Sequence, residues 1–368
     1  MSISPLQIGL IGCGKISGAY FKGCKAYPGL QIAGCADLNV DLARRVAAEE
    51  GVPFAGTVEE LLARPEIELV INLTIPAAHA AINRQALAAG KHVYCEKPFA
   101  LTAADTLAVV DEAAAAGLRV GSAPDTFLGA GIQTARHLID AGEIGRPIAA
   151  LGFMMGSGHE SWHPNPAFYY QAGGGPMLDM GPYYVTALVN LLGPVTRVSG
   201  MTQTSFPTRT ITSEPRRGEV INVEVPTHYS TSLEFAAGAT GTLVMSFDTV
   251  PFQLPNLVVY GTTGTLRVPD PNVFDGEVQI RRRGDPDFTP VPWTHALGRE
   301  RGSGVADLAA ALRSGRPHRA NGDLAKHVVE VLEAAARSHS EARHITLSST
   351  CERPAAVPPT LPAGEFEP

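Results

Sequence analysis

Two short segments carry side chains suited to proton transfer. The first ends an apolar run with the triplet Glu96-Lys97-Pro98. The second leads from a glycine-rich stretch into an apolar helical pattern and places Asp179 four residues before Tyr183, so that both lie on one helical face. A lysine beside a carboxylate and a phenol can hold a hydroxyl group and move its proton. These segments therefore predict acid/base chemistry on an alcohol.

A glycine turn near the N-terminus predicts a dinucleotide site. The apolar run Leu6–Ile11 leads into the sequence Gly12-Cys13-Gly14-Lys15-Ile16-Ser17. Glycine lets the backbone approach a pyrophosphate closely, and the N–H groups of the following helix, expected to start near Lys15, point at the phosphates. Ser17 stands where the G-x-G-x-x-G pattern has its third glycine. The residues expected to contact the cofactor here are Gly12, Gly14, Lys15 and Ile16.

The next apolar run bears on the choice of cofactor. It covers Leu30–Ala36 and ends at Asp37, 23 residues after Gly14. An acidic residue near this position accepts hydrogen bonds from the adenosine ribose and repels a 2′-phosphate, so we predict NAD rather than NADP. The alternative is that Asp37 only caps the next helix, Val40–Glu50.

The rest of the pattern divides the 368 residues into two domains and a tail, within the α/β class. Residues 1–125 alternate strand and helix, which predicts a Rossmann domain with a parallel sheet. Residues 126–347 carry longer alternating runs joined by turns, followed by two helices. They predict an α+β domain with a large, mostly antiparallel open sheet. Residues 348–368 are rich in proline and predict an extended tail.

Apolar runs and periodicity give the expected elements. The expected strands are Leu6–Ile11, Leu30–Ala36, Leu69–Leu73, His92–Cys95, Arg119–Gly121, Thr227–Phe235, Thr240–Phe247, Leu257–Tyr260, Thr265–Val268 and Glu277–Arg281. The further expected helices are Ala77–Ala89, Thr102–Ala116, Leu128–Asp140, Gly304–Ser314 and Leu324–Ser338.

The composition bears on partners and location. The net charge is −7, and no basic run stands out beyond Arg281-Arg282-Arg283, so we expect no nucleic-acid partner. No apolar stretch approaches the roughly 20 residues that span a bilayer, and no signal-like segment precedes the first strand. We therefore expect a cytoplasmic protein without a membrane partner. The five cysteines are scattered and show no metal-ligand spacing, so we expect reduced thiols and no metal.

Taken together, the motifs resemble those of the Gfo/Idh/MocA oxidoreductases, which include glucose-fructose oxidoreductase and inositol dehydrogenase. The resemblance covers about residues 6 to 345. It rests on the glycine turn, the segment from Thr74 and Pro76 to His79, the Glu96-Lys97-Pro98 triplet and the Asp179-x-Gly181-x-Tyr183 helix. The resemblance implies NAD as cofactor and, by analogy, a homodimer or homotetramer. The cofactor contacts that it adds are Thr74, Pro76, His79, Glu96 and Lys97.

The resemblance also implies roles in a reaction. In this family the triplet lysine contacts the nicotinamide ribose and the reacting hydroxyl, which implies that role for Lys97. Partial burial and a cationic nicotinamide would lower the pKa of Lys97 and let it help remove a proton. Many members have histidine four residues after the aspartate, whereas this chain has Tyr183. The tyrosine variant implies that Tyr183 is the acid/base, assisted by Lys97, with Asp179 as the third catalytic residue.

The choice of base stays open at this point. An unperturbed tyrosine has a pKa near 10, so a neighbouring ammonium and the oxidised cofactor must stabilise its phenolate. Tyr184 and His163 are the alternatives to Tyr183.

Polar and aromatic residues outside these motifs are candidates for substrate binding. Residues 158–170 are rich in His, Asn and aromatic side chains, which suit the hydroxyls and the apolar C–H face of a sugar. The same composition also suits a packed domain junction. His228 lies on a predicted strand and is equally compatible with a substrate contact and with a core histidine. The expected substrate contacts are Asp125, His163, Asn165, Tyr184 and His228.

The leading interpretation is an NAD-dependent oxidoreductase that transfers a hydride between nicotinamide and a secondary alcohol of a sugar, polyol or sugar derivative. The alternative is an NAD-dependent glycoside hydrolase that oxidises its sugar transiently, eliminates the aglycone, adds water and returns the hydride. That enzyme needs a second base, which the His and Tyr residues between His159 and Tyr184 could supply.

Three arginines bear on this alternative. Arg209, Arg216 and Arg217 could bind an anionic glycoside such as a sulfosugar, or they could be solvated loop arginines.

A third class of function is a catalytically silent NAD-binding regulator. The presence of Lys97 and Tyr183 argues against that class.

Overall fold

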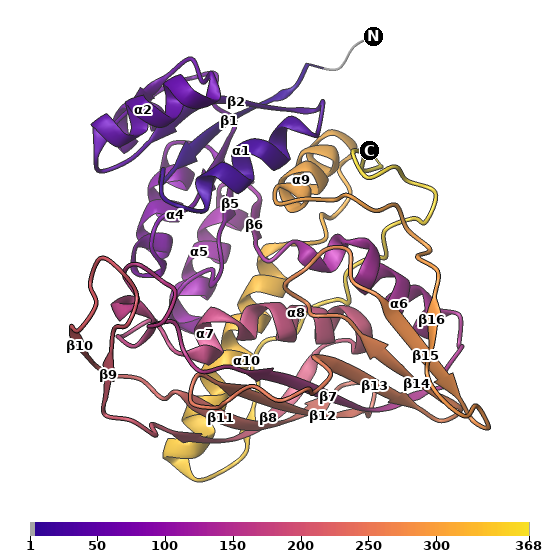
Figure 1. Ribbon diagram of the computed structural model, residues 1–368. Coiled ribbons are helices and arrows are strands. Elements are labelled where there is room, and N and C mark those ends of the chain that lie inside the picture. The colour runs from indigo at the N-terminus through magenta and orange to yellow at the C-terminus, as the bar shows by residue number, and fades with distance from the viewer. Residues whose placement is uncertain (1–3, 368) are drawn as a thin grey trace.

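The computed structural model describes residues 4–367 and contains two large sheets with helices packed on them (Figure 1). The first sheet is parallel and has six strands in the order β3-β2-β1-β4-β5-β6. Its strands are β1 (Leu6–Ile11), β2 (Leu30–Ala36), β3 (Ala55–Gly56), β4 (Leu69–Asn72), β5 (His92–Cys95) and β6 (Val120–Ser122). Its helices are α1 (Ser17–Lys25), α2 (Val40–Glu50), α3 (Val58–Leu62), α4 (His79–Ala88) and α5 (Ala103–Ala115).

Local sequence explains where these elements begin. β4 is buried along its whole length, as expected for a central parallel strand covered on both faces. Asn39 caps α2, and Thr102 caps α5 through the N–H of Asp105. Thr57 and Glu60 form a reciprocal capping box at α3. The order of the sheet reverses between β1 and β4, which is where ligands bind in open α/β sheets.

The second sheet has nine strands in the order β16-β15-β14-β13-β7-β12-β11-β8-β17. Only the pair β7 and β12 is parallel among its described strand pairs, so the sheet is mostly antiparallel, as predicted. Its strands are β7 (Pro147–Met155), β8 (Val195–Gln203), β11 (His228–Phe235), β12 (Thr240–Ser246), β13 (Leu257–Gly261), β14 (Gly264–Val268), β15 (Val278–Arg282), β16 (Thr289–Val291) and β17 (Ile345–Thr346). A separate small hairpin joins β9 (Thr208–Thr210) and β10 (Val220–Asn222).

The remaining helices connect this sheet to the first domain. They are α6 (Ala130–Asp140), α7 (Pro176–Asp179), α8 (Gly181–Leu192), α9 (Ser303–Ser314) and α10 (Gly322–Glu341), with short 3₁₀ turns η1 (Pro76–Ala78), η2 (Thr126–Leu128) and η3 (Ala167–Tyr169). Figure 1 shows α6 and α8 between the large sheet and the first domain. α10 packs on β8 and β17 and also on α5 and β6, so one helix contacts both sheets.

The C-terminal residues cross both domains in extended form. Cys351 and Val357 are buried in the main apolar core. Phe366 stacks on Tyr27, which follows α1, with ring centroids 6.2 Å apart. Arg299 reaches the backbone oxygens of residues 362 and 365, so the tail is fastened to the loop before α9.

The structure confirms the predicted two-sheet α/β architecture. β1, β2 and β5 have the predicted bounds, whereas β7 and β8 lie in stretches where no strand was predicted. No helix among residues 4–367 is long and apolar enough to cross a membrane.

Candidate active site

The glycine turn lies at the carboxyl end of β1 and fits a pyrophosphate. Gly12 has a φ of 98°, and a Cβ there would lie 2.7 Å from the carbonyl carbon of Leu73, so only glycine fits. At Gly14 a Cβ would meet nothing within 4 Å in the described part of the chain, so this backbone is open to a ligand. α1 begins at Ser17, two residues after the predicted start, and no described side chain caps its first turn. The N–H groups of a helix start without a side-chain cap suit the phosphates of NAD.

Asp37 lies next to this turn. Its Oδ2 accepts a hydrogen bond from the N–H of Cys13 at 2.8 Å, and its Oδ1 accepts one from the N–H of Asn39 at 2.8 Å. Asn39 caps α2 by accepting from the N–H of Leu42, so the interpretation of Asp37 as the helix cap is wrong. The carboxylate is held beside the glycine turn, where a ribose of NAD is expected.

We expect Asp37→Ala to narrow the preference for NADH over NADPH by about tenfold or more, because a charge-assisted hydrogen bond to the ribose and the repulsion of a 2′-phosphate are both lost. The measurement is the ratio of the two dissociation constants from nicotinamide fluorescence. Asp41→Ala, at an exposed carboxylate of the same domain, is the matched control and should leave the ratio unchanged. An unaltered ratio in Asp37→Ala would refute the assignment.

The loop after β4 is held by hydrogen bonds to buried polar side chains. Asn72 Oδ1 accepts from both the N–H and the hydroxyl of Thr74, at 3.1 and 2.7 Å, and Pro76 begins the partly exposed turn η1. His79 is buried, with its two ring nitrogens 2.6 Å from the Pro98 oxygen and 3.0 Å from the Thr74 oxygen. The expected cofactor contact of His79 therefore needs correction, because its side chain joins two loops and does not face the cleft.

The Glu96-Lys97-Pro98 triplet lies at the carboxyl end of β5. Glu96 is buried, and its Oε1 accepts from the hydroxyl of Tyr20 at 2.9 Å. Its Oε2 accepts from the backbone N–H of Lys97 at 2.8 Å. Both oxygens of Glu96 are thus engaged inside the protein, where they hold the backbone that presents Lys97.

Lys97 and Asp179 form an ion pair that is mostly shielded from water. Lys97 Nζ lies 2.8 Å from Asp179 Oδ1 and donates to the backbone oxygen of Asp179 at 2.6 Å. Burial alone would lower the pKa of Lys97 and raise that of Asp179. The attraction between the two charges outweighs burial, so the pKa of the lysine lies above its ordinary value and that of the carboxyl below. The expected lowering of the Lys97 pKa is therefore absent in this state, and Lys97 is a protonated hydrogen-bond donor.

Tyr183 faces the same lysine. It belongs to α8, which Met180 separates from the short helix α7 that ends at Asp179. Lys97 Nζ lies 5.3 Å from the centroid of the Tyr183 ring, so the predicted proximity of the three side chains is present. Burial raises the pKa of Tyr183, while Lys97 and Arg301 oppose this rise. The group at the phenol oxygen is Arg301, whose Nη2 donates to it at 3.0 Å.

Residues 158–170 form the opposite wall of the site. His159 stacks on Tyr169, with ring centroids 3.7 Å apart and an interplanar angle of 11°. Its Nε2 lies 3.5 Å from Asp179 Oδ2, and its Nδ1 is buried without a hydrogen-bond partner among the described residues. His159 thus touches the carboxylate on the side opposite Lys97.

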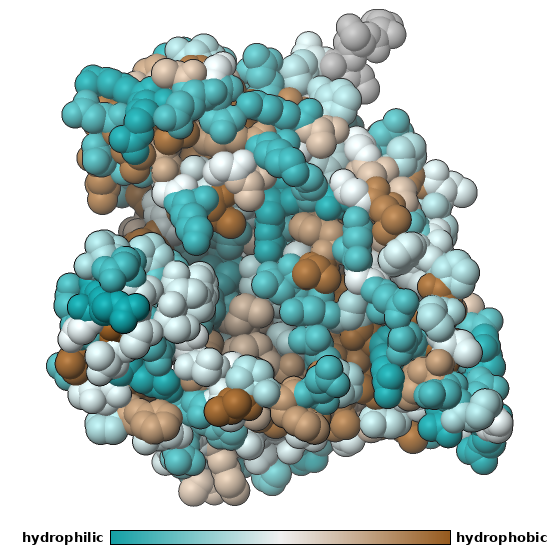
Figure 2. All heavy atoms as spheres, in the orientation of Figure 1, coloured by the Kyte–Doolittle hydropathy of each residue, from teal (hydrophilic) through white to brown (hydrophobic). Residues whose placement is uncertain are grey.

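The outer part of this wall is aromatic and accessible. Trp162 is 56% exposed and Phe168 is 45% exposed. Lys15 Nζ, from the glycine turn, lies 5.7 Å from the Trp162 ring, so the wall faces the first domain. Figure 2 shows the surface hollowed between the first domain and the loops around β9 and β10. A ligand in this hollow would contact both domains.

His163 and Asn165 belong to the same wall, whereas His228 lies on the large sheet. His163 is half-buried, and its Nδ1 accepts from the N–H of Asn165 at 3.1 Å. Asn165 is exposed and bonds to Arg216. His228 begins β11, with Nδ1 3.0 Å from the hydroxyl of Ser246. The wall position of His163 and Asn165 agrees with the predicted substrate contacts, which remain predictions.

Two predicted substrate contacts need correction. Tyr184 is fully buried, donates to the Phe153 oxygen at 3.0 Å and accepts from Asn256 at 3.0 Å. One residue along a helix turns the side chain by about 100°, so Tyr184 points into the large sheet and not toward Lys97. Asp125 also has no exposed surface, and it accepts from the backbone N–H groups of Gly302 and Gly304 at the start of α9. Neither side chain reaches the cleft.

The arginines considered for an anionic substrate have carboxylate partners within the chain. Arg209 is nearly buried and pairs with Glu160 at 2.8 Å and with Asp248. Arg216 pairs with Glu219 and Arg217 with Glu214, each within one loop. Their placement gives the anionic-substrate hypothesis no support.

Sequence reasoning missed Arg301 and gave His159 no role of its own. Arg301 follows Tyr183 by 118 positions and lies in a loop without a motif. His159 belongs to the segment singled out by its composition, but nothing in its spacing indicates a contact with Asp179. Both contacts depend on how the second domain folds back on the first.

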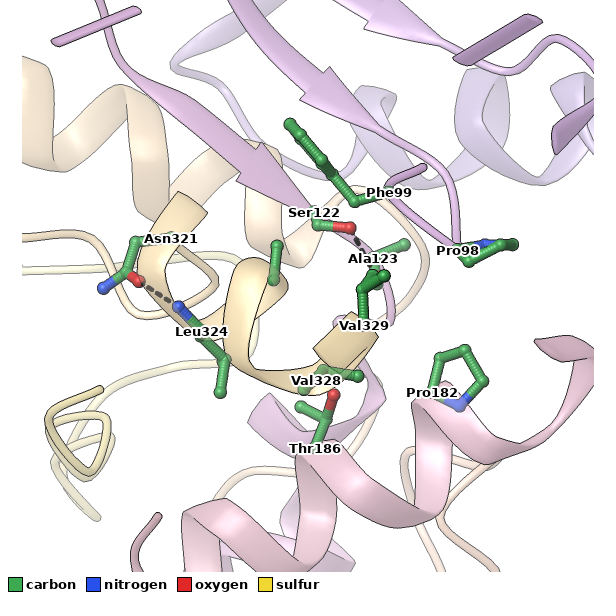
Figure 3. A pocket seen from close by; sticks show the side chains of 11 residues that line it. Pro98, Phe99, Ser122, Ala123, Pro182, Thr186, Asn321, Leu324, Val328 and Val329 are labelled. Atoms are coloured by element: carbon green, nitrogen blue, oxygen red, sulfur yellow. Dashed lines mark hydrogen bonds between the residues drawn. The ribbon is translucent and has the colours of Figure 1, made fainter. Parts of the chain in front are cut away.

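A small cavity lies behind Pro98 at the domain junction (Figure 3). It is lined by Pro98 and Phe99 from the turn after β5, by Pro182 and Thr186 of α8, and by apolar residues of α10 including Val328. Its volume of about 10 Å³ has room for about one water molecule, so it is not a substrate site.

The fold and the site together are those of an NAD-binding oxidoreductase. Residues 6–123 match the oxidoreductase family with an NAD-binding Rossmann fold, and residues 132–267 match the GFO/IDH/MocA C-terminal domain. The chain belongs to the Gfo/Idh/MocA oxidoreductase family.

Curated relatives match part of the chain. The inositol 2-dehydrogenase of Gluconacetobacter diazotrophicus is 40% identical over 119 residues, which are 31% of this chain and 35% of that protein. The 1,5-anhydro-D-fructose reductase of Ensifer adhaerens is 32% identical over 176 residues, 47% of this chain and 52% of that protein. The matches thus span about a third to a half of these relatives.

Solved structures are similar over nearly the whole chain. Levoglucosan dehydrogenase has a TM-score of 0.82 at 23% identity, covering 95% of this chain and 100% of that one. The aldose-aldose oxidoreductase of Caulobacter crescentus has a TM-score of 0.78 at 22% identity, covering 93% and 100%. At these identities the similarity shows the fold.

Proposed function

We propose that this protein is an NAD-dependent oxidoreductase that acts on a secondary alcohol of a sugar, polyol or sugar derivative. The observation that carries the proposal is the placement of the Lys97–Asp179 pair and the Tyr183 hydroxyl together at the carboxyl end of the parallel sheet, near the glycine turn. Relatives named as inositol, xylose and levoglucosan dehydrogenases support this substrate class.

The residues divide the work between holding the alcohol and moving its proton. Lys97 is fixed by Asp179 and stays protonated, so it donates a hydrogen bond to the substrate oxygen and holds the carbinol carbon in place. Tyr183 accepts the hydroxyl proton in the direction of oxidation and returns it in the direction of reduction. NAD, when bound, supplies the acceptor for the hydride that leaves the carbinol carbon, so that alcohol and NAD⁺ give ketone, NADH and a proton.

The wall of residues 158–170 supports a carbohydrate in this hollow. Trp162 and Phe168 offer exposed aromatic faces that suit the apolar C–H face of a pyranose or cyclitol ring. Polar groups beside them, such as His163 and Asn165, suit hydroxyl groups. The arrangement therefore favours a polyhydroxylated ring over a flat apolar ligand.

The redox-cycling glycosidase remains the second hypothesis, and it uses the same three residues. It needs a further base beside the reacting carbon. His159 touches Asp179 and has an unpaired Nδ1 among the described residues, which gives this hypothesis one candidate. The carboxylate partners of Arg209 leave that arginine engaged inside the chain, so it does not support recognition of an anionic glycoside.

One assay separates the two hypotheses. The purified protein is mixed with free sugars, polyols and nitrophenyl glycosides, with and without NAD⁺, and the absorption spectrum is followed over time. Growth of the NADH band in proportion to substrate consumed supports the oxidoreductase. Release of nitrophenolate that depends on NAD⁺, without accumulation of NADH, supports the glycosidase. Absence of both signals across the panel would contradict the proposed function.

A further inference from the structure

Arg301 is a charged side chain within hydrogen-bond distance of the phenol oxygen of the proposed acid/base. Its Nη2 donates to the Tyr183 hydroxyl at 3.0 Å, and its guanidinium lies 5.3 Å from the centroid of the same ring. The side chain is only 15% exposed, so water screens the contact weakly. None of the sequence motifs includes this residue.

The position of Arg301 is set from several sides. Its Nη1 lies 3.5 Å from Oδ1 of Asp125, and its Nη2 also donates to Asn272 at 3.2 Å. Asp125 is itself fixed, because its Oδ2 accepts from the N–H groups of Gly302 and Gly304 at 2.9 and 3.2 Å. The backbone at Arg301 packs tightly on α1, where a Cβ on Gly23 would overlap its oxygen.

The other charged groups around Tyr183 form hydrogen bonds with other partners. Lys97, from the turn after β5, faces the ring and has its ammonium bonded to Asp179 of α7. Glu96, from the same turn, is engaged by Tyr20 and by the backbone of Lys97. Tyr169, from η3, is a further titratable side chain close enough to interact with Tyr183. Among the described residues, the donor at the Tyr183 oxygen is therefore Arg301.

We propose that Arg301, anchored by Asp125, is a positioning residue that stabilises the phenolate of Tyr183 and turns its O–H hydrogen toward the cleft. The inference rests on the proposed function, in which Tyr183 exchanges a proton with the substrate. In this proposal the guanidinium of Arg301 stabilises the Tyr183 phenolate, a role that the motifs alone would give to Lys97.

The chemistry of arginine suits this task. A guanidinium keeps its charge at every working pH, so it donates to the phenol and to the phenolate alike. The hydrogen bond strengthens when the oxygen becomes negative, which favours loss of the phenol proton. Because Arg301 occupies one lone pair of the phenol oxygen, the O–H hydrogen of the neutral form must point elsewhere. Lys97 can then remain protonated and bonded to Asp179 throughout the reaction.

The first readout is the ionisation of Tyr183 without substrate. Incorporation of 3-fluorotyrosine at position 183 makes the phenol more acidic, and its ¹⁹F signal reports the phenolate as the pH is raised. In Arg301→Met the midpoint should move up by about one pH unit or more, since an opposite charge beside an acid shifts its pKa by about that much. Arg301→Lys, which keeps the charge, should recover part of the shift.

A matched control separates this effect from disturbance of the loop. Arg299→Met removes a guanidinium two residues away that bonds to the tail and not to Tyr183, and it should leave the midpoint unchanged. Arg301→Gln provides a second neutral variant that retains hydrogen bonding to Asp125, so the test stands if the methionine variant fails to fold. An unshifted midpoint in a folded neutral variant would overturn the inference.

The second readout is turnover. With a substrate from the panel above, the pH at which oxidation becomes half-maximal should rise in Arg301→Met by the same amount, with activity recovering at high pH. A lower rate at every pH, with neither the ¹⁹F midpoint nor the activity midpoint moved, would indicate a purely structural role and contradict the inference. If the ¹⁹F midpoint moves and the activity profile does not, the inference about Arg301 stands and the role of Tyr183 in the proposed function fails.

Discussion

Replacing Lys97 by methionine should lower kcat by about 10²- to 10⁴-fold, the usual contribution of a positioned proton-handling group. The ammonium is the proposed donor to the substrate oxygen, and methionine has similar length without a proton to donate. The measurement is kcat for the best substrate of the panel, together with the dissociation constant for NADH. Cofactor affinity should change less than kcat, because the glycine turn and Asp37 are untouched.

The same substitution should also destabilise the protein, which calls for a control. Asp179 would be left buried without its partner, and removing one member of a buried ion pair costs about 3–5 kcal/mol in the free energy of unfolding. The double variant Lys97→Met/Asp179→Asn removes the orphaned charge and should recover much of the thermal stability while kcat stays low. Recovery of turnover in the double variant would show that Lys97 acts on stability and not on the reaction.

Removing one oxygen atom in Tyr183→Phe should depress kcat by about 10²- to 10⁴-fold with little change in NADH affinity. The variant keeps the ring over Lys97 but has no atom that can take the hydroxyl proton. Arg301 loses one acceptor and keeps its contacts with Asn272 and Asp125, so the protein should remain folded. Steady-state kinetics and a thermal melt test both statements.

Tyr184→Phe is the natural comparison, because the two tyrosines are neighbours in one helix. Tyr184 makes two hydrogen bonds inside the large sheet, so its loss should lower the free energy of unfolding by about 1–3 kcal/mol and leave kcat within a few-fold. If Tyr184→Phe abolished turnover and Tyr183→Phe did not, the assignment of the acid/base would be wrong.

Much of the first domain is predictable from local sequence. Its strands are mostly buried and form short apolar runs in the sequence, so β1, β2 and β5 have the predicted bounds. The strands of the second domain are harder to predict from sequence, because some of them have a weak apolar pattern. β8 includes the exposed residues Thr196, Arg197 and Met201, so its apolar signal is diluted. β7 contains Gly152 and several half-buried positions, which also obscure the pattern.

The site shows the same division between local and distant information. Lys97, Asp179 and Tyr183 come together because each lies at a defined place in a local motif. The contact of Arg301 with Tyr183 joins segments 118 positions apart and depends on packing of the loop before α9 against α1. The buried position of Tyr184, which was predicted to contact substrate, has a different origin. One step along a helix decides whether a tyrosine faces the cleft or the sheet.

The contact of α10 with the first domain bears on the order in which the chain folds during synthesis. Ala325 and Val329 of α10 belong to the same buried apolar cluster as Val93 and Phe99, and Asn321 forms a β-bridge with Gly121 of β6. The parallel sheet is therefore complete in sequence by residue 122, long before the surface that covers its edge has been translated. A nascent first domain exposes this apolar patch until α10 arrives, a stage at which partly folded chains are prone to aggregate.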